Sequence, residues 1–222
     1  MATGTKPEMA KEEVAVEVEP NTGVPFPVKL GDGKLQLNCV GVRRRSILGL
    51  GIKVYAFGIY ADNEKLKDLM KSKIGTAPPA PTKEMYDVVI ESDVPMMIRI
   101  SMTFSNISNT PLVKSGFADE IAGAIEKLNG GKRNDELSKM VLGPLSDNVQ
   151  LKVGSLIEIY RLSGYVLQTK VMGELVSKVD GERVSKVDSE LLCKTMIYFY
   201  LGHDDLDKEA REKFGMFLLS LF

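Results

Sequence analysis

The sequence predicts one α+β domain in which helices pack on an antiparallel sheet. Strand-like and helix-like segments come in blocks rather than in strict alternation, which argues against a parallel α/β sheet. Two apolar strand-like segments are separated only by Gly49-Leu50-Gly51, which indicates a hairpin. A chain of 222 residues without a break in composition is long enough for one domain with a full core.

The first half of the chain contains most of the predicted strands. Residues 1–20 are acidic and lack arginine, and we expect them to form a disordered lead before a domain that spans 21–222. The segment 24–30 contains two prolines, which suits an edge strand. Alternating apolar residues predict longer strands at 35–48, 52–61 and 95–104. Asp62 or Asn63 could cap a helix at 64–73, and a stiff proline-rich loop at 77–81 ends before a short helix at 83–90.

The second half is expected to add two strands and most of the helical layer. Thr110-Pro111 is a helix start signal, and an apolar stripe follows it as far as Leu128. A short helix is expected at 134–142 and paired strands at 155–161 and 166–176. The last two helices are expected at 187–201 and 205–221. The stretch Val176–Asp180 is repeated as Val184–Asp188, and we interpret this as a small tandem duplication in a flexible connection.

Composition excludes several classes of function. Lysine and arginine number 29 against 30 aspartates and glutamates, which argues against a nucleic-acid partner. No apolar run reaches the length of a membrane span. Cys39 and Cys193 lie in apolar segments and are expected to be buried free thiols, and His203 is the only histidine. No metal spacing, nucleotide fingerprint or nucleophile motif is present, so we expect no cofactor, no metal and no catalytic residue.

Three consecutive arginines, Arg43, Arg44 and Arg45, are the main candidates for a binding role. If odd positions continue the face of Leu35, Leu37 and Cys39, Arg43 and Arg45 fall on the apolar side and Arg44 points away. No acidic residue lies between position 33 and Asp62, so no local partner is available for a buried guanidinium. The functional interpretation is an arginine that holds the carboxylate of a ligand. The alternative, with all three in solvent at a strand end, stays open.

Tyr55 begins the apolar face of the next strand, ahead of Phe57 and Ile59. Its ordinary role would be a core aromatic whose hydroxyl finds a backbone partner. Its functional role would be a second hydrogen-bond donor to the anion that the arginine binds, with apolar neighbours accepting a tail.

These residues resemble a known family. Gly41–Arg43 followed by Ile52–Asp62 is similar to the paired strands of the chalcone isomerase-fold proteins, and the segment from Asp188 to Gly202 agrees. The resemblance covers about residues 20–222, and Val18–Phe26 is similar to the plant fatty-acid-binding branch, whose members are not catalysts. It implies an open-faced β-sandwich in which an antiparallel sheet is covered by a layer of helices.

The resemblance also implies a function and a site. Arg43 and Tyr55 would bind the carboxylate of a medium-chain or long-chain free fatty acid, and whether Arg45 joins them is open. Tyr55 stands where the isomerase has a catalytic threonine. The isomerase's tyrosine, asparagine and late threonine fall near Pro111, Ala118 and Phe199 of this chain, so each polar catalytic group is replaced. We therefore expect a non-catalytic binding protein. The alternatives are a chalcone isomerase and a non-catalytic partner of a polyketide or flavonoid pathway enzyme.

We expect a monomer. The resemblance further implies that the protein lies in the chloroplast stroma, with the cytoplasm as the alternative compartment.

Overall fold

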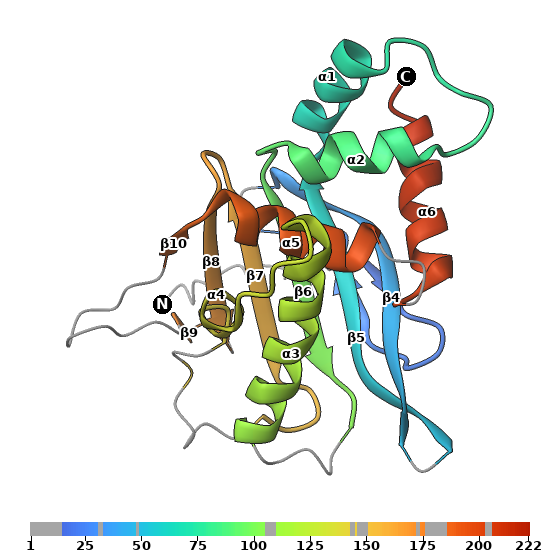
Figure 1. The fold of residues 1–222 in the computed structure, drawn as a ribbon. Helices are drawn as coiled ribbons and strands as arrows, with labels where there is room; N and C mark the ends of the chain where they lie inside the picture. Colours follow the sequence, from blue (N-terminus) through green and yellow to red (C-terminus); the bar gives the residue numbers. More distant parts are fainter. Residues whose placement is uncertain are drawn as a thin grey trace, which may run out of the picture.

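A single antiparallel sheet forms the centre of the computed structural model (Figure 1), which describes residues 15–30, 33–47, 49–104, 110–142, 145, 151–171, 174–175, 186–202 and 206–222. The strand order is β10-β8-β7-β6-β5-β4-β3, and β9 pairs with β8 at one side. The strands are β3 (Lys29–Leu30), β4 (Leu35–Ile47), β5 (Leu50–Asp62), β6 (Met96–Met102), β7 (Leu156–Leu162), β8 (Val166–Val171), β9 (Glu174–Leu175) and β10 (Lys186–Asp188).

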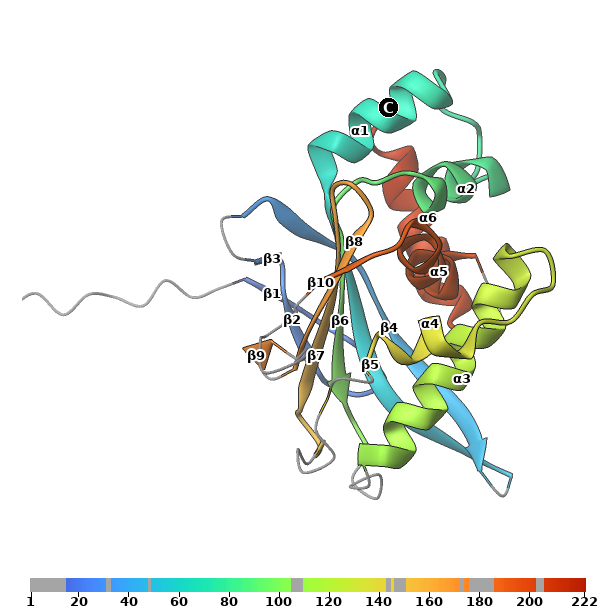
Figure 2. The same cartoon turned by 60° about the vertical axis from the view of Figure 1, so that its left-hand side comes forward.

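The helices gather on one face of this sheet, as Figure 2 shows from the side. They are α1 (Asn63–Lys73), α2 (Lys83–Glu91), α3 (Thr110–Leu128), α4 (Asp135–Lys139), α5 (Glu190–Leu201) and α6 (Lys208–Leu219). Five of them begin at a residue whose side chain accepts a backbone N–H of the first turn, namely Asp62, Thr82, Asn134, Ser189 and Asp207. The predicted α+β class, with helices on an antiparallel sheet, is confirmed.

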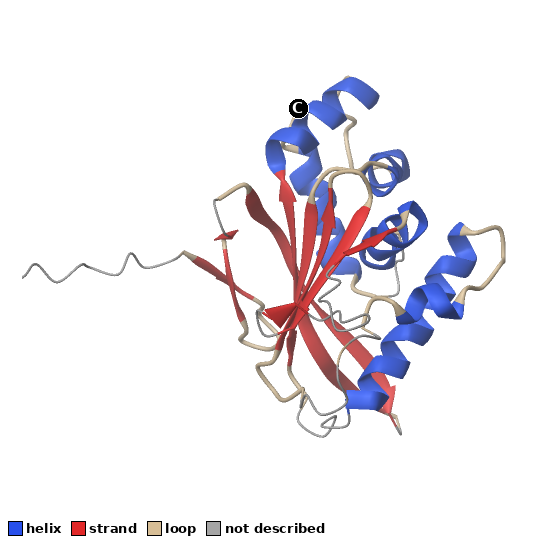
Figure 3. Ribbon diagram, turned by 90° about the vertical axis from the view of Figure 1, so that its left-hand side faces the viewer, coloured by secondary structure: helices blue, strands red, loops and turns tan. Residues whose placement is uncertain are grey.

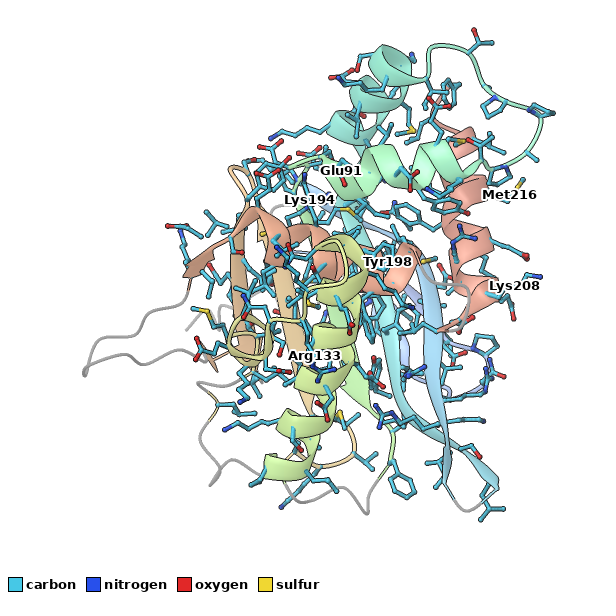
Figure 4. All side chains as sticks on the ribbon, in the orientation of Figure 1. Glu91, Arg133, Lys194, Tyr198, Lys208 and Met216 are labelled. Carbon is cyan, nitrogen blue, oxygen red and sulfur yellow. The ribbon has the colours of Figure 1, made fainter. Side chains whose placement is uncertain are left out.

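The core lies between the sheet and the helices. Along β6, Met96, Ile98 and Ile100 belong to the main core cluster, whereas Arg99 lies on the opposite face beside Glu158, as the period of a strand requires. The helical layer is joined internally as well, because Lys194 of α5 forms an ion pair with Glu91 at the end of α2 (Figure 4).

A short hairpin covers part of the opposite face of the sheet (Figure 3). It pairs β1 (Val16–Val18) with β2 (Pro25–Pro27), and Phe26 packs against Val40 and Ala56 in a second, smaller core. Gly58 makes this contact possible, because a Cβ there would lie 2.8 Å from the Phe26 ring.

Ordered structure thus begins inside the segment that was expected to be a disordered lead. Glu19 exposes only 1% of its surface, and its carboxylate accepts hydrogen bonds from Asn21 and Thr22. These short-range bonds close the turn between β1 and β2, which explains why an acidic segment is part of the fold. Residues 1–14 lie outside the described part of the chain.

Two irregularities interrupt the pairing of β4 with β5. The register shifts between Leu37 and Cys39, and again between Arg43 and Arg44. Each shift leaves one extra residue, Asn38 in β4 and Val54 in β5, which is the pattern of a β-bulge. The first bulge places Leu37 in the small core and Cys39 in the main core, so the expectation that both share one face is wrong.

The remaining differences from the expected elements are local. Residues 187 and 188 belong to β10, which pairs with β8, and α5 begins only after its cap Ser189. Cys39 and Cys193 are free and buried, as predicted. His203 and most of the Val176–Asp188 duplication lie outside the described residues. Among the residues that are described, no helix is long and apolar enough to cross a membrane, and no cluster of side chains suits a metal ion.

Candidate ligand-binding site

A cavity of about 300 Å³ lies between the sheet and α3. Its walls are almost entirely apolar and come from β5, β6, β7, α3 and the segment after α4, through residues that include Val54, Ile100, Met102, Val113, Phe117 and Leu142. Leu112 lines it too and is 61% exposed, so this part of the wall opens to solvent. Apolar walls with a few convergent polar groups are typical of small-molecule sites.

Three charged side chains meet at one end of the cavity. Glu120 of α3 accepts a hydrogen bond from Arg43 Nη2 at 2.7 Å and from Arg45 Nε at 2.8 Å, and Arg45 Nη2 bonds the same carboxylate oxygen. Arg43 exposes 19% of its side chain and Glu120 13%, whereas Arg45 exposes 44%. Burial alone would lower the pKa of Arg43, but the hydrogen bond and charge of Glu120 outweigh it and raise that pKa. The cluster therefore carries two positive charges and one negative charge.

Tyr55 adds a buried hydroxyl beside these charges. It pairs with Arg43 across the hairpin, and its hydroxyl lies 3.4 Å from that of Tyr200 on α5. Burial raises the pKa of Tyr55, and the nearby charge of Glu120 raises it further. Burial also raises the pKa of Tyr200 well above its ordinary value. Both phenols thus keep their proton at physiological pH, and Tyr55, which lines the cavity, is able to donate a hydrogen bond to an anion.

The fold fixes these side chains through the irregular hairpin. The second bulge lets Val54 and Tyr55, neighbours in sequence, both line the cavity. On β4, Gly41 allows α6 to approach closely, because a Cβ there would lie 2.6 Å from Ala210 Cβ. Asp207, the cap of α6, then accepts the backbone N–H of Val42 at 2.8 Å and ties the strand down next to Arg43.

One donor of the cluster has no acceptor. Arg43 Nε is buried and makes no hydrogen bond within the described part of the chain. Because a buried donor without a partner is costly, an anion that reached Arg43 Nε would remove that cost. The arrangement has the chemistry to hold a carboxylate at its polar end and a hydrocarbon chain along its walls.

The structure brings together the two residues that the sequence singled out. Arg43 and Tyr55 both line the cavity, and Arg45 joins them, which the sequence left undecided. Arg44 is exposed. The counter-charge that was thought to be missing from the chain is in part supplied by Glu120, which the sequence reasoning missed together with Tyr200.

The position of Glu120 in the sequence is a weak indication of its role. It follows Gly116 by four residues and Phe117 by three, so it shares their side of α3, and all three line the cavity. An acid on the flank of an apolar stripe is a candidate partner for a buried cation. Glu120 is 77 positions from Arg43, however, so sequence proximity does not connect the two residues.

A second hollow adjoins the first. It measures about 220 Å³ and is lined by both Arg43 and Glu120, together with Gly123, Ala124 and Phe199. The ion pair between Arg43 and Glu120 therefore borders both spaces.

Comparison with known proteins identifies close relatives. No family model matches the chain. It is 48% identical over 224 aligned positions to chalcone isomerase-like protein 1 of Humulus lupulus, across 100% of both chains. It is 34% identical to fatty-acid-binding protein 1 of Arabidopsis thaliana over 201 positions, which cover 89% of this chain and 68% of the relative. The crystal structure of an Arabidopsis thaliana fatty-acid-binding protein superposes with a TM-score of 0.82 at 33% identity, covering 93% of this chain and 98% of that chain.

Proposed function

The chain belongs to the chalcone isomerase-like family, in its fatty-acid-binding branch, and on that premise we propose that it binds free fatty acids in the cavity beneath α3 and catalyses no reaction. The observation that carries the proposal is an apolar cavity whose polar end holds two guanidiniums and a buried phenol. Arg43 and Arg45 carry two positive charges and Glu120 carries one negative charge, so one ligand carboxylate would neutralise the cluster.

In the proposed complex the head group lies at the hairpin and the tail at the helix. The guanidiniums of Arg43 and Arg45 and the hydroxyl of Tyr55 donate to the carboxylate, since charge-assisted bonds of this kind are the strong ones. The acyl chain runs along Ile100, Met102 and Phe117. Each methylene that leaves water contributes about 0.8 kcal/mol, so the tail supplies most of the affinity and the head group sets the orientation.

The cavity volume favours a medium-length acyl chain. Ligand cavities commonly measure roughly 300 to 1,000 Å³, and this one, at about 300 Å³, lies at the lower limit. A longer tail would extend past the exposed Leu112 into solvent and gain little from its last carbons. We propose laurate as a better probe than oleate.

Removing the head-group donors tests the proposal. In the double variant Arg43→Ala with Tyr55→Phe, laurate affinity measured by calorimetry is expected to fall about tenfold or more, because charge-assisted hydrogen bonds are lost. Arg44→Ala is the matched control: it removes a neighbouring arginine that is exposed and does not line the cavity, and it is expected to leave affinity unchanged.

Two results would contradict the proposal. An unchanged laurate affinity in the double variant would show that the carboxylate binds elsewhere. Loss of naringenin chalcone absorbance faster than the spontaneous ring closure would show that the protein is an isomerase. Native mass spectrometry of protein purified without added lipid provides a further check, since a retained fatty acid is expected there.

A further inference from the structure

Glu120 is the only acidic side chain among the described residues that line the cavity. It lies where the ligand head group is proposed to bind, and a single oxygen, Oε1, accepts the bonds of both guanidiniums. Its sequence neighbour Asp119 is different, because it lies at the surface and forms an ion pair with Arg133 at 2.8 Å.

The empty cavity needs a negative charge at this point. Arg43 is largely buried, and an isolated cation beside apolar walls costs much more than a paired one. A ligand carboxylate removes that cost when it is bound, and in its absence Glu120 is the acid that pairs with Arg43 among the residues that the structure describes. Glu120 thus offers the arginines the same chemical group that a fatty acid offers.

We propose that Glu120 is an internal counter-ion, which stabilises the empty site and which the carboxylate of the incoming fatty acid displaces from the arginines. The proposal rests on the proposed function, since it names the group that competes with the ligand. Its consequence is that part of the binding energy of the head group is used to replace an existing ion pair. The protein thereby holds a fatty acid less tightly than its two guanidiniums allow, which favours release.

The structure gives the displaced carboxylate a place to go. The adjoining hollow of about 220 Å³ is lined by Glu120 itself, by the small residues Gly123 and Ala124 of the same helix, and by the charged residues Arg43, Asp119 and Lys127. A rotation of the Glu120 side chain toward this hollow would make room for a ligand carboxylate beside the guanidiniums without moving α3.

The isosteric variant Glu120→Gln separates the two roles of this residue. It removes the competing charge, so laurate affinity measured by calorimetry is expected to rise about tenfold or more, the size of one charge-assisted hydrogen bond. It also leaves the arginines without a counter-charge, so the melting temperature of the ligand-free variant is expected to fall below that of the wild type. Saturating laurate is then expected to raise that temperature more in the variant than in the wild type.

The controls exclude a general effect of charge. Glu126→Gln makes the same chemical change on the same helix, at an exposed residue that lines neither the cavity nor the adjoining hollow, and it is expected to alter neither affinity nor melting temperature appreciably. Dodecanol, which has no carboxylate, is expected to bind the wild type and Glu120→Gln equally. If Glu120→Gln does not fold, Glu120→Asp, whose carboxylate is one methylene further from the arginines, is expected to shift both quantities in the same directions by less.

The outcomes distinguish this proposal from the proposed function. If laurate binds the wild type but binds Glu120→Gln equally or more weakly, Glu120 positions the arginines rather than competing for them, and the counter-ion proposal is wrong. If laurate binds none of the proteins, the proposed fatty-acid binding is wrong. The melting temperature of ligand-free Glu120→Gln then still tests the counter-ion role, and an unchanged value would overturn it.

Discussion

At the scale of single residues, Arg161 shows how this fold accommodates a cation away from the cavity. It is 1% exposed and donates to the backbone oxygens of Val94 at 2.9 Å, Val89 at 3.0 Å and Ile90 at 3.2 Å. These carbonyls lie at or just beyond the C-terminal end of α2, where the helix dipole is negative. Burial lowers the pKa of Arg161 to about 10, which still leaves it charged at neutral pH.

Replacing Arg161 with methionine is expected to destabilise the protein by about 2–4 kcal/mol, since several buried carbonyls would lose their donor. The free energy of unfolding in urea measures this change. Arg133→Ala is the control, because Arg133 pairs with acids only at the surface, where solvent screens the interaction. A loss no greater for Arg161→Met than for this control would show that the α2 carbonyls do not depend on the guanidinium.

At the scale of secondary-structure elements, Asp207 joins α6 to the sheet. One of its oxygens caps the helix by accepting the N–H of Ala210 at 3.1 Å, and the other accepts the N–H of Val42 in β4 at 2.8 Å. The same carboxylate therefore satisfies a helix end and a strand donor. Arg43 follows Val42 directly, so this bond also fixes the backbone on which the site is built.

Asp207→Ala is expected to cost about 2–3 kcal/mol of unfolding free energy, because a helix cap and a strand hydrogen bond are lost together. Asp62→Ala provides the comparison, since Asp62 caps α1 by accepting the N–H of Lys65 and is expected to cost about 1 kcal/mol. Equal losses in thermal or urea unfolding would mean that the bond to Val42 contributes nothing.

At the scale of the whole molecule, the layered architecture could be predicted from local patterns. Alternating apolar residues indicated the central strands, and start signals marked α1 and α3, because both signals are local in sequence. The caps Ser189 and Asp207 were missed, so α5 and α6 were expected to begin too early. The hydrogen bond from Arg43 to Glu120 could not be predicted in this way, since the two residues are 77 positions apart and meet only when α3 packs on the sheet. The inward position of Arg161 was not predicted, although Arg161 continues the alternation of Ile157 and Ile159 along β7.

We also propose a molecular state and a compartment for the protein, the compartment from the resemblance to plant fatty-acid-binding proteins. It is expected to be a monomer in the chloroplast stroma, with and without ligand. Light scattering after gel filtration is expected to give about the chain mass of 24.4 kDa in both states. A fluorescent fusion of the full-length protein in leaf cells checks the compartment, and a purely cytosolic signal or a dimer mass would contradict the expectation.

Because of the two bulges in the β4–β5 hairpin, the site depends on the number of residues in each strand. Each bulge reverses which alternate residues face the helices, so Arg43 points toward Glu120 only because a definite number of residues separates it from Asn38. Losing one residue from this strand would turn the arginine to the outer face without changing a single side chain of the site. Substitutions in this hairpin are therefore tolerated more readily than insertions or deletions. Related chains that bind the same ligand are expected to keep the same number of residues between Asn38 and Tyr55.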